Sequence, residues 1–177
     1  MSTPKDADDV KLVASLFSPE EKILDKVTLE LVASYGATDW VSPPLFFDRT
    51  RYYEKEMSWP LHRRFVSFKP LIRPEAIVDI KLQTNELERR YLQEGRRKVN
   101  IDPGYVALER LVLATGKNYT HRIHLLKGIY ADLTLVFHQG SFQTLAWTYR
   151  DYADPVVIGY FNALRERYKN QLRGVSE

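Results

Sequence analysis

The residues best suited to chemistry lie in the second half of the chain. His121 follows Lys117 closely, and such a pair can hold an anion, or transfer protons if the histidine pKa is tuned toward neutrality. Asp102 and Asp151 are carboxylates that can act as general bases. These residues lead to the hypothesis of a small enzyme that uses His121 with Asp102 or Asp151 on an anionic substrate.

Each of these residues also has a structural interpretation. His121 could lie in a pocket, or it could be buried in the core, since a shift of one residue in strand register exchanges the two faces of a strand. Asp102 suits the first position of a type II turn over residues 102–105, where aspartate side chains bond the backbone. Tyr149, close to Asp151, could stack on a base or sugar, or could cover the core.

The charge of the chain is unevenly distributed. The net charge of the 177 residues is only +3. Residues 1–60 carry 7 basic and 11 acidic groups, a net of −4, whereas residues 61–128 carry 14 basic and 7 acidic groups, a net of +7. Arginine dominates the basic segment, and its guanidinium group matches the geometry of phosphate and carboxylate.

The basic segment favours a binding function over the enzyme hypothesis. We predict that the protein binds a phosphorylated or nucleotide-like anionic ligand, with RNA as one candidate. The residues predicted to bind this ligand are Arg63, Arg64, Lys117, Arg122 and Tyr149. Arg122 is also expected to lie opposite Asp132 in a hairpin, where the two side chains would form an ion pair on a surface ladder.

A third hypothesis is a protein-interaction module. Residues 43–62 form an irregular segment too long for an ordinary connection, and long loops are often functional. The segment and its flank are rich in aromatic residues, among them Trp40, Phe46 and Trp59. An exposed aromatic patch there would favour a protein partner.

Several classes of protein are excluded. The chain has no cysteine, so it has neither disulfides nor thiolate metal sites. No glycine-rich phosphate-binding motif occurs, and no cofactor is predicted. His121 and His124 should point to opposite faces of a strand, so no metal site is predicted. The chain lacks an apolar stretch long enough to cross a membrane, so no membrane segment is predicted. Its first ten residues are polar and do not resemble a signal peptide, which predicts a cytoplasmic protein. The sequence does not predict an oligomeric state.

Hydrophobic periodicity predicts the secondary structure of the first half. A buried strand is expected at residues 11–17, followed by a helix at residues 19–35 that ends at Gly36. Further strands are expected at residues 37–42 and 64–71, and a long helix at residues 74–94.

In the second half, two paired strands are expected at residues 97–101 and 106–114, with a helix from residue 103 to 116 as the alternative for this region. A hairpin at residues 119–137 should place Ile123 opposite Ala131, with the His121 side of the strand facing the apolar interior. A strand at residues 142–147 and a helix from Pro155 complete the series.

Five sequence blocks carry a family resemblance. They are Asn100–Tyr105, Leu111–Thr115, Lys117–Ile123, Gly128–Leu135 and Trp147–Tyr152. With these blocks the chain resembles the bacterial domain-of-unknown-function 4416 family over nearly its whole length. This resemblance implies no activity.

The predicted elements together define the fold class. We expect an α+β domain with a largely antiparallel or mixed sheet and two to three helices packed on one face. Residues 1–10 are expected to be a disordered lead-in, and residues 11–177 a single domain with a long irregular loop at 43–62.

Overall fold

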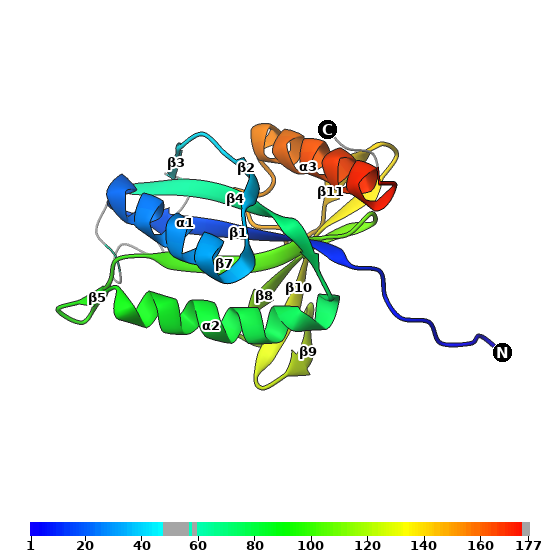
Figure 1. The fold of residues 1–177 in the computed structure, drawn as a ribbon, viewed down its shortest axis with the longest axis horizontal. Coiled ribbons are helices and arrows are strands. Elements are labelled where there is room, and N and C mark those ends of the chain that lie inside the picture. Colours follow the sequence, from blue (N-terminus) through cyan, green and yellow to red (C-terminus); the bar gives the residue numbers. More distant parts are fainter. Residues whose placement is uncertain (48–56, 58–59, 175–177) are drawn as a thin grey trace.

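The computed structural model describes residues 1–47, 57 and 60–174. Within these residues, a nine-stranded antiparallel sheet packs against three α-helices, which confirms the α+β class (Figure 1). The elements in chain order are β1 Val10–Ser18, α1 Glu21–Tyr35, β2 Thr38–Val41, β3 Leu45–Phe47, β4 Leu61–Ile72, a short 3₁₀ helix Pro74–Ala76, α2 Ile77–Arg90, β5 Leu92–Gln93, β6 Arg96–Arg97, β7 Asn100–Val106, β8 Arg110–Thr115, β9 Arg122–Leu126, β10 Ile129–His138, β11 Ser141–Thr144 and α3 Pro155–Leu172.

The strand order along the sheet is β11-β10-β8-β7-β1-β4-β2. β9 and β11 pair with successive parts of β10, on the edge opposite β8. β3 and β2 likewise share the outer edge of β4. The hairpin of β5 and β6 is separate from this sheet. Because β1 lies between β4 and β7, it is the central strand, and all nine of its residues are buried.

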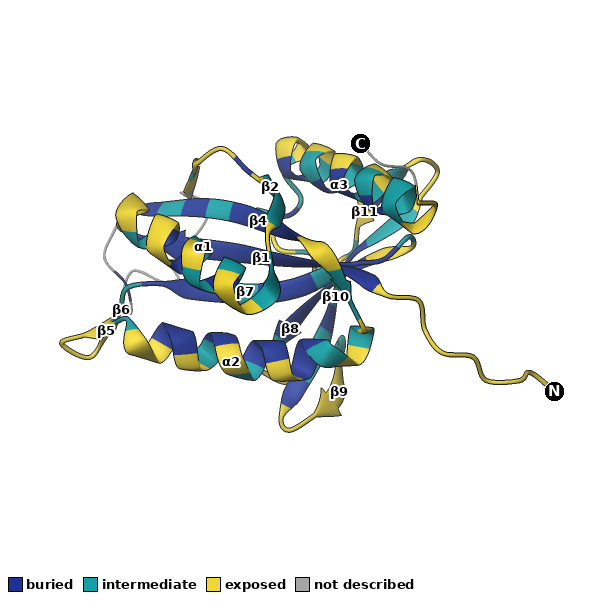
Figure 2. Cartoon of the chain, in the orientation of Figure 1, coloured by how far each residue is buried: buried dark blue, intermediate teal, exposed yellow. Residues whose placement is uncertain are grey.

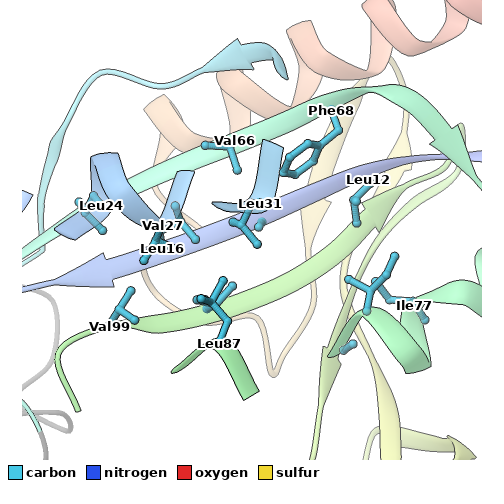
Figure 3. Close-up of a cluster of buried hydrophobic side chains, with 14 of the residues drawn as sticks. Leu12, Leu16, Leu24, Val27, Leu31, Val66, Phe68, Ile77, Leu87 and Val99 are labelled. Carbon is cyan, nitrogen blue, oxygen red and sulfur yellow. The ribbon is translucent and has the colours of Figure 1, made fainter. Parts of the chain in front are cut away.

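The helices cover both faces of the sheet. α1 and α2 share one apolar core with Leu12, Ala14 and Leu16 of β1 (Figure 3). α3 packs against the opposite face, in a second core that contains Val13 of β1. The alternation of β1 side chains between the two cores follows from the two-residue period of a strand. The expectation that the helices pack on one face is therefore confirmed for α1 and α2. It is wrong for α3, which packs on the other face.

Residues 102–105 do not form the predicted turn. They lie inside β7, where Asp102 is opposite Ser15 of β1 and Gly104 is opposite Val13. The predicted pairing of residues 97–101 with 106–114 is wrong, and so is the alternative of a helix from residue 103 to 116. β7 pairs with β8 only from Gly104 to Val106, and residues 107–109 connect the two strands. Gly104 is required at the point where the two strands meet, because a Cβ atom there would lie 2.4 Å from the carbonyl oxygen of Val112.

The ladder between β7 and β8 ends at Gly104, and the two strands separate beyond it. Pro103 has no N–H to offer a neighbouring strand, so it tolerates this unpaired edge. Two side chains of α2 bond the backbone of Ile101 instead: Glu88 Oε1 accepts from its N–H at 2.6 Å, and Lys81 Nζ donates to its carbonyl at 2.8 Å. The opening between β7 and β8 is thus stabilised by polar side chains of α2.

The hairpin of β9 and β10 has the predicted register, but its faces are reversed. Ile123 lies opposite Ala131 and Arg122 opposite Asp132, as expected. Ile123 is 69% exposed, however, whereas Asp132 is buried, so the polar face points inward. Figure 2 shows β9 as an exposed strand. The prediction that Arg122 and Asp132 form a surface ladder is wrong: their side chains are buried, because Trp147 and Tyr149 cover this face of the hairpin.

Two boundaries also differ from the sequence predictions. The long helix ends at Arg90 rather than at residue 94, because residues 92–97 form the β5–β6 hairpin. Residues 1–9 precede β1 without helix or strand.

Residues 48–56 and 58–59 of the predicted 43–62 loop lie outside the described residues. In the part of the chain that is described, no helix has the length and apolarity needed to cross a membrane.

Candidate functional site

A cavity of about 680 Å³ lies where β7 and β8 separate, a volume in the range of small-molecule sites. It is lined from both sides of the sheet, by α2 on one side and by residues 149–152 on the other. The lining residues are Phe17, Lys81, Asn85, Glu88, Arg97, Asn100, Asp102, Leu113, Ala114, Thr115, Gly116, Lys117, Arg122, Asp132, Tyr149, Arg150, Asp151 and Tyr152.

The α2 wall of the cavity is a polar stripe on an otherwise apolar helix face. Lys81, Asn85 and Glu88 are spaced four and three residues apart, which places them on one side of the helix. Lys81 and Glu88 are both buried. Burial raises the pKa of the Glu88 carboxyl above its ordinary value, and the nearby Lys81 ammonium and the bond from Ile101 partly counter this effect.

Asp102 enters the cavity from the unpaired edge of β7. Its Oδ2 accepts a hydrogen bond of 2.7 Å from the side-chain amide of Asn100. Its Oδ1 lies 3.7 Å from Lys81 Nζ, which is an ion pair but is beyond hydrogen-bond distance. Arg97 closes this corner, because its guanidinium donates to Asn100 Oδ1 at 2.9 Å and lies 3.4 Å from Glu88 Oε2.

Arg122 is held in a fixed position at the opposite wall. Its Nε donates to Asp132 Oδ2 at 2.8 Å, and its Nη2 donates to the Tyr149 hydroxyl at 2.5 Å. Its Nη1 donates to the carbonyl of Lys117 at 2.9 Å. Partial burial raises the pKa of Tyr149; Arg122 opposes this shift, and Asp132 and Asp102 add to it. Asp102 is therefore within electrostatic range of this wall.

His121 supports the wall from behind and does not line the cavity. Its Nε2 lies 3.3 Å from Asp132 Oδ2, and its side chain is almost completely buried. The indole ring of Trp147 stacks on the imidazole, with the ring centroids 4.9 Å apart. His121 thus lies within reach of a carboxylate, at the same Asp132 oxygen that Arg122 bonds, but it is not among the residues that line the cavity.

Asp151 is paired with the most deeply buried arginine of the sheet. Arg63 forms a salt bridge to Asp151 Oδ2, and its Nε donates to the Ser15 hydroxyl at 3.1 Å. The guanidinium lies over the rings of Phe65 and Tyr152, with distances of 4.1 and 4.6 Å to their centroids. Cation–π contacts and the salt bridge together compensate for burial of this charge.

The cavity has a surplus of positive charge. Its lining contains five basic and four acidic side chains, and Arg63 directly behind Asp151 adds a sixth basic group. Each of the four carboxylates has a cationic partner within the site: Glu88 has Arg97, Asp102 has Lys81, Asp132 has Arg122 and Asp151 has Arg63. Lys117 and Arg150 are the other two basic side chains of the lining. Among the described residues, Arg150 is exposed and has no ion pair or hydrogen bond to another side chain.

The structure brings most of the predicted site residues together. Those that line the cavity are Asp102, Lys117, Arg122, Tyr149 and Asp151. Arg63 and His121 each lie behind a lining carboxylate. Arg64 is elsewhere, because it alternates with Arg63 along β4 and forms a salt bridge of 2.6 Å with Asp25 of α1.

Sequence reasoning missed the α2 wall and Arg150. Lys81, Asn85 and Glu88 recur at helical spacing beside the apolar stripe of α2, and this spacing is the signal by which they could have been found. Arg150 has no such signal, since residues 149–152 have neither a helical nor a strand period. Within the described residues, no three histidine or carboxylate side chains are grouped so that they could hold a metal ion.

The aromatic residues proposed for protein interaction are only partly described. Trp40 packs on Tyr160 of α3, with ring centroids 5.3 Å apart, and Phe46 is 61% exposed. Trp59 and the tyrosines at 52 and 53 lie outside the described residues. The interaction hypothesis therefore stays a prediction.

Comparison with known proteins agrees with the resemblance seen in the sequence blocks. A search of curated proteins gave no match, and neither did a search of solved structures. A family model described as a domain of unknown function, DUF4416, matches residues 8–168. This range contains β1 through most of α3, and with it every residue that lines the cavity. The chain therefore belongs to the DUF4416 family.

Proposed function

We propose that this protein binds a small phosphorylated or nucleotide-like anion in the cavity between β7 and β8. The observation that carries the proposal is the charge surplus: the lining has five basic side chains against four carboxylates, Arg63 lies directly behind it, and the exposed Arg150 has no ion pair among the described residues. A phosphate monoester carries close to two negative charges at neutral pH, which complements this surplus. Lysine and arginine are the side chains that most often bind phosphate.

The size and position of the cavity favour a small molecule over RNA. The basic groups gather around one partly open cavity rather than along a stripe, whereas RNA-binding proteins present basic and aromatic groups along a groove. The exposed strand next to the cavity, β9, presents Ile123, Leu125 and Leu126 rather than cations. We include a cytoplasmic location in the proposal, since phosphorylated metabolites and nucleotides are intracellular compounds.

The enzyme hypothesis has weaker support. Asp102 and Asp151 line the cavity, but His121 does not, so the predicted histidine–carboxylate pair does not face one shared substrate. Asp151 is occupied by its salt bridge to the buried Arg63, which indicates a structural role for this carboxylate. Binding is the function that this geometry supports best.

Calorimetric titration with inorganic phosphate, ribose 5-phosphate, AMP and a short single-stranded RNA tests the proposal. We expect the small phosphates to bind, more weakly at high salt, and Arg150→Gln and Lys117→Gln to weaken each of them. Arg89→Gln is the matched control, because Arg89 is exposed on α2 and pairs with Glu86. Absence of binding at low salt, or equal binding by wild type and Arg150→Gln, would refute the proposal. Tighter binding of RNA than of every small phosphate would favour RNA instead.

A further inference from the structure

The Lys81–Asp102 pair differs from the other ion pairs of the cavity. The salt bridges of Asp132 and Asp151 are closed by direct hydrogen bonds to arginine. Lys81 Nζ and Asp102 Oδ1, in contrast, are 3.7 Å apart, and both residues line the cavity. The two charges attract each other without being hydrogen-bonded.

Both members of this pair have unused hydrogen-bonding capacity. An ammonium group has three N–H donors. Among the described residues, Lys81 donates one hydrogen bond, to the carbonyl of Ile101, although its side chain is only 8% exposed. Asp102 Oδ2 accepts from Asn100, but its Oδ1 has no hydrogen-bond donor in the described part of the chain. The Asp102 side chain is 32% exposed, so burial constrains Lys81 more than Asp102. Buried polar groups usually find partners, so the incomplete hydrogen bonding of the Lys81 ammonium at a cavity wall indicates a position for a ligand group.

The group that completes this pair must offer a donor and an acceptor side by side. A donor is needed for Asp102 Oδ1 and an acceptor for Lys81 Nζ, each at about 2.8 Å. A second cation would be repelled by Lys81, and a second anion by Asp102. Two neighbouring hydroxyl groups meet both requirements, because one donates to the carboxylate while the other accepts from the ammonium.

The surroundings of the pair favour hydroxyl groups over a nucleobase. Asn85 is one helical turn from Lys81 and lines the same cavity, and Asn100 bonds Asp102 directly. These neighbours are polar amides rather than aromatic rings on which a base could stack. Amides can add further hydrogen bonds to hydroxyl oxygens.

We infer that Lys81 and Asp102 bind a vicinal diol of the ligand, so that the ligand is a sugar phosphate or a nucleotide held through its ribose. This inference rests on the proposed function and adds a second subsite to it: the phosphate lies toward Lys117 and Arg150, and the diol between β7 and α2.

Titration with three probes tests the diol subsite in the wild-type protein. Ribose 5-phosphate carries the 2,3-diol, 2-deoxyribose 5-phosphate lacks one of its hydroxyls, and inorganic phosphate carries the anion alone. We expect ribose 5-phosphate to bind about tenfold more tightly than the deoxy sugar, as the loss of a hydrogen bond to a charged group implies. Equal affinities of the two sugars, with phosphate still bound, would overturn the diol inference and leave the proposed function standing. Absence of binding by all three, phosphate included, would instead overturn the proposed function.

An isosteric variant locates the diol on the proposed pair. Asp102→Asn keeps an acceptor for Asn100 but turns an amide N–H toward Lys81, and it should abolish the preference for ribose 5-phosphate over its deoxy counterpart. Inorganic phosphate should bind somewhat more tightly, because the variant removes a negative charge from the cavity. Asp25→Asn, on the exposed face of α1, is the matched control. AMP and 2′-deoxy-AMP are compared in the same variant. If Asp102→Asn weakened both nucleotides equally, the pair would contact the base, and the inference would be wrong.

Discussion

Two buried lysines, Lys11 and Lys81, show how the same side chain takes different roles in this molecule. Lys11 is completely buried on β1, and its ammonium donates to three acceptors: Asp39 Oδ2 at 2.6 Å, the carbonyl of Phe68 at 3.2 Å and Gln171 Oε1 at 2.5 Å. Every donor of this ammonium has a partner. The group is therefore satisfied by the protein alone.

Lys81 is buried to a similar extent, but its ammonium has fewer hydrogen-bond partners than that of Lys11. Its Nζ donates to one backbone carbonyl and approaches Asp102 without a hydrogen bond. The difference follows from the sheet. Lys11 lies on a strand that is paired on both edges, whereas Lys81 reaches the unpaired edge of β7 beside the cavity. A lysine whose N–H donors all have partners within the protein has a structural role. A buried lysine with unused donors beside a cavity is suited to bind a ligand.

The largest expected effect is on stability, for Lys11→Met. This variant leaves Asp39 without its ammonium partner, and breaking a buried pair costs about 3 kcal/mol or more. We expect a loss of about 3 kcal/mol in the free energy of unfolding measured with urea, with phosphate affinity unchanged. The double variant Lys11→Met with Asp39→Asn should recover part of the loss, because it removes the unpaired charge. A loss below about 1 kcal/mol would contradict the structural role of Lys11.

A smaller loss of stability is expected for Lys81→Met. The variant leaves the carbonyl of Ile101 without its donor, which costs about 1–3 kcal/mol. It should also remove the preference for ribose 5-phosphate over its deoxy counterpart, whereas Lys11→Met keeps that preference. If the two lysine variants lost equal stability and neither changed ligand preference, the distinction between a structural and a binding lysine would fail.

A pH-dependent effect is expected for Glu88→Gln. Burial raises the pKa of Glu88 above the ordinary value of 4.5, so the folded protein binds this proton more tightly than the unfolded chain does. The contribution of Glu88 to stability is then fully present below pH 4.5 and is lost as the pH rises through the folded-state pKa. Glutamine keeps an acceptor for the N–H of Ile101 and does not titrate.

Urea unfolding of wild type and Glu88→Gln at a series of pH values measures this effect. The wild type should gain stability relative to the variant as the pH is lowered from neutral toward 4.5. Glu86→Gln is the matched control, because it makes the same substitution at an exposed position of the same helix. A difference that is constant with pH, or that changes in the opposite direction, would refute the expected shift.

The smallest effect is expected for Tyr149→Phe. This variant removes the hydroxyl that accepts from Arg122 Nη2 and leaves the two other bonds of that guanidinium intact. Because Tyr149 is exposed at the rim, we expect a loss of about 1 kcal/mol or less in the free energy of unfolding. Chemical denaturation measures this loss. A loss as large as that of Lys11→Met would show that Arg122 depends on Tyr149 for its position.

Much of the fold could be predicted because its signals are local. The apolar run of β1, the stripe of α1 with Gly36 at its end, and the register of the β9–β10 hairpin follow from hydrophobic period and turn residues. Gly36 has the expected positive φ of 93°, and Asp154 caps α3 as its position before Pro155 predicts.

The errors occur where local and tertiary signals conflict. The Asp-Pro-Gly sequence at 102–104 is a strong turn signal, yet these residues are a strand because β1 pairs with them and α2 supplies side chains to Ile101. The hairpin faces were assigned by polarity, which fails when a polar face lines a cavity and Ile123 faces outward.

Most elements, the family and several of the residues around the cavity could be predicted from the sequence, because these signals depend on spacing along the chain. Which of these residues line one cavity depends on the tertiary fold. Arg63 and Arg64 are neighbours in sequence, but the alternation of β4 sends one to Asp151 and the other to Asp25. Conversely, the cavity joins Lys81 to Asp102 and Asp151 through contacts between α2, β7 and residues 149–152 that no local pattern encodes, because they arise where two strands part.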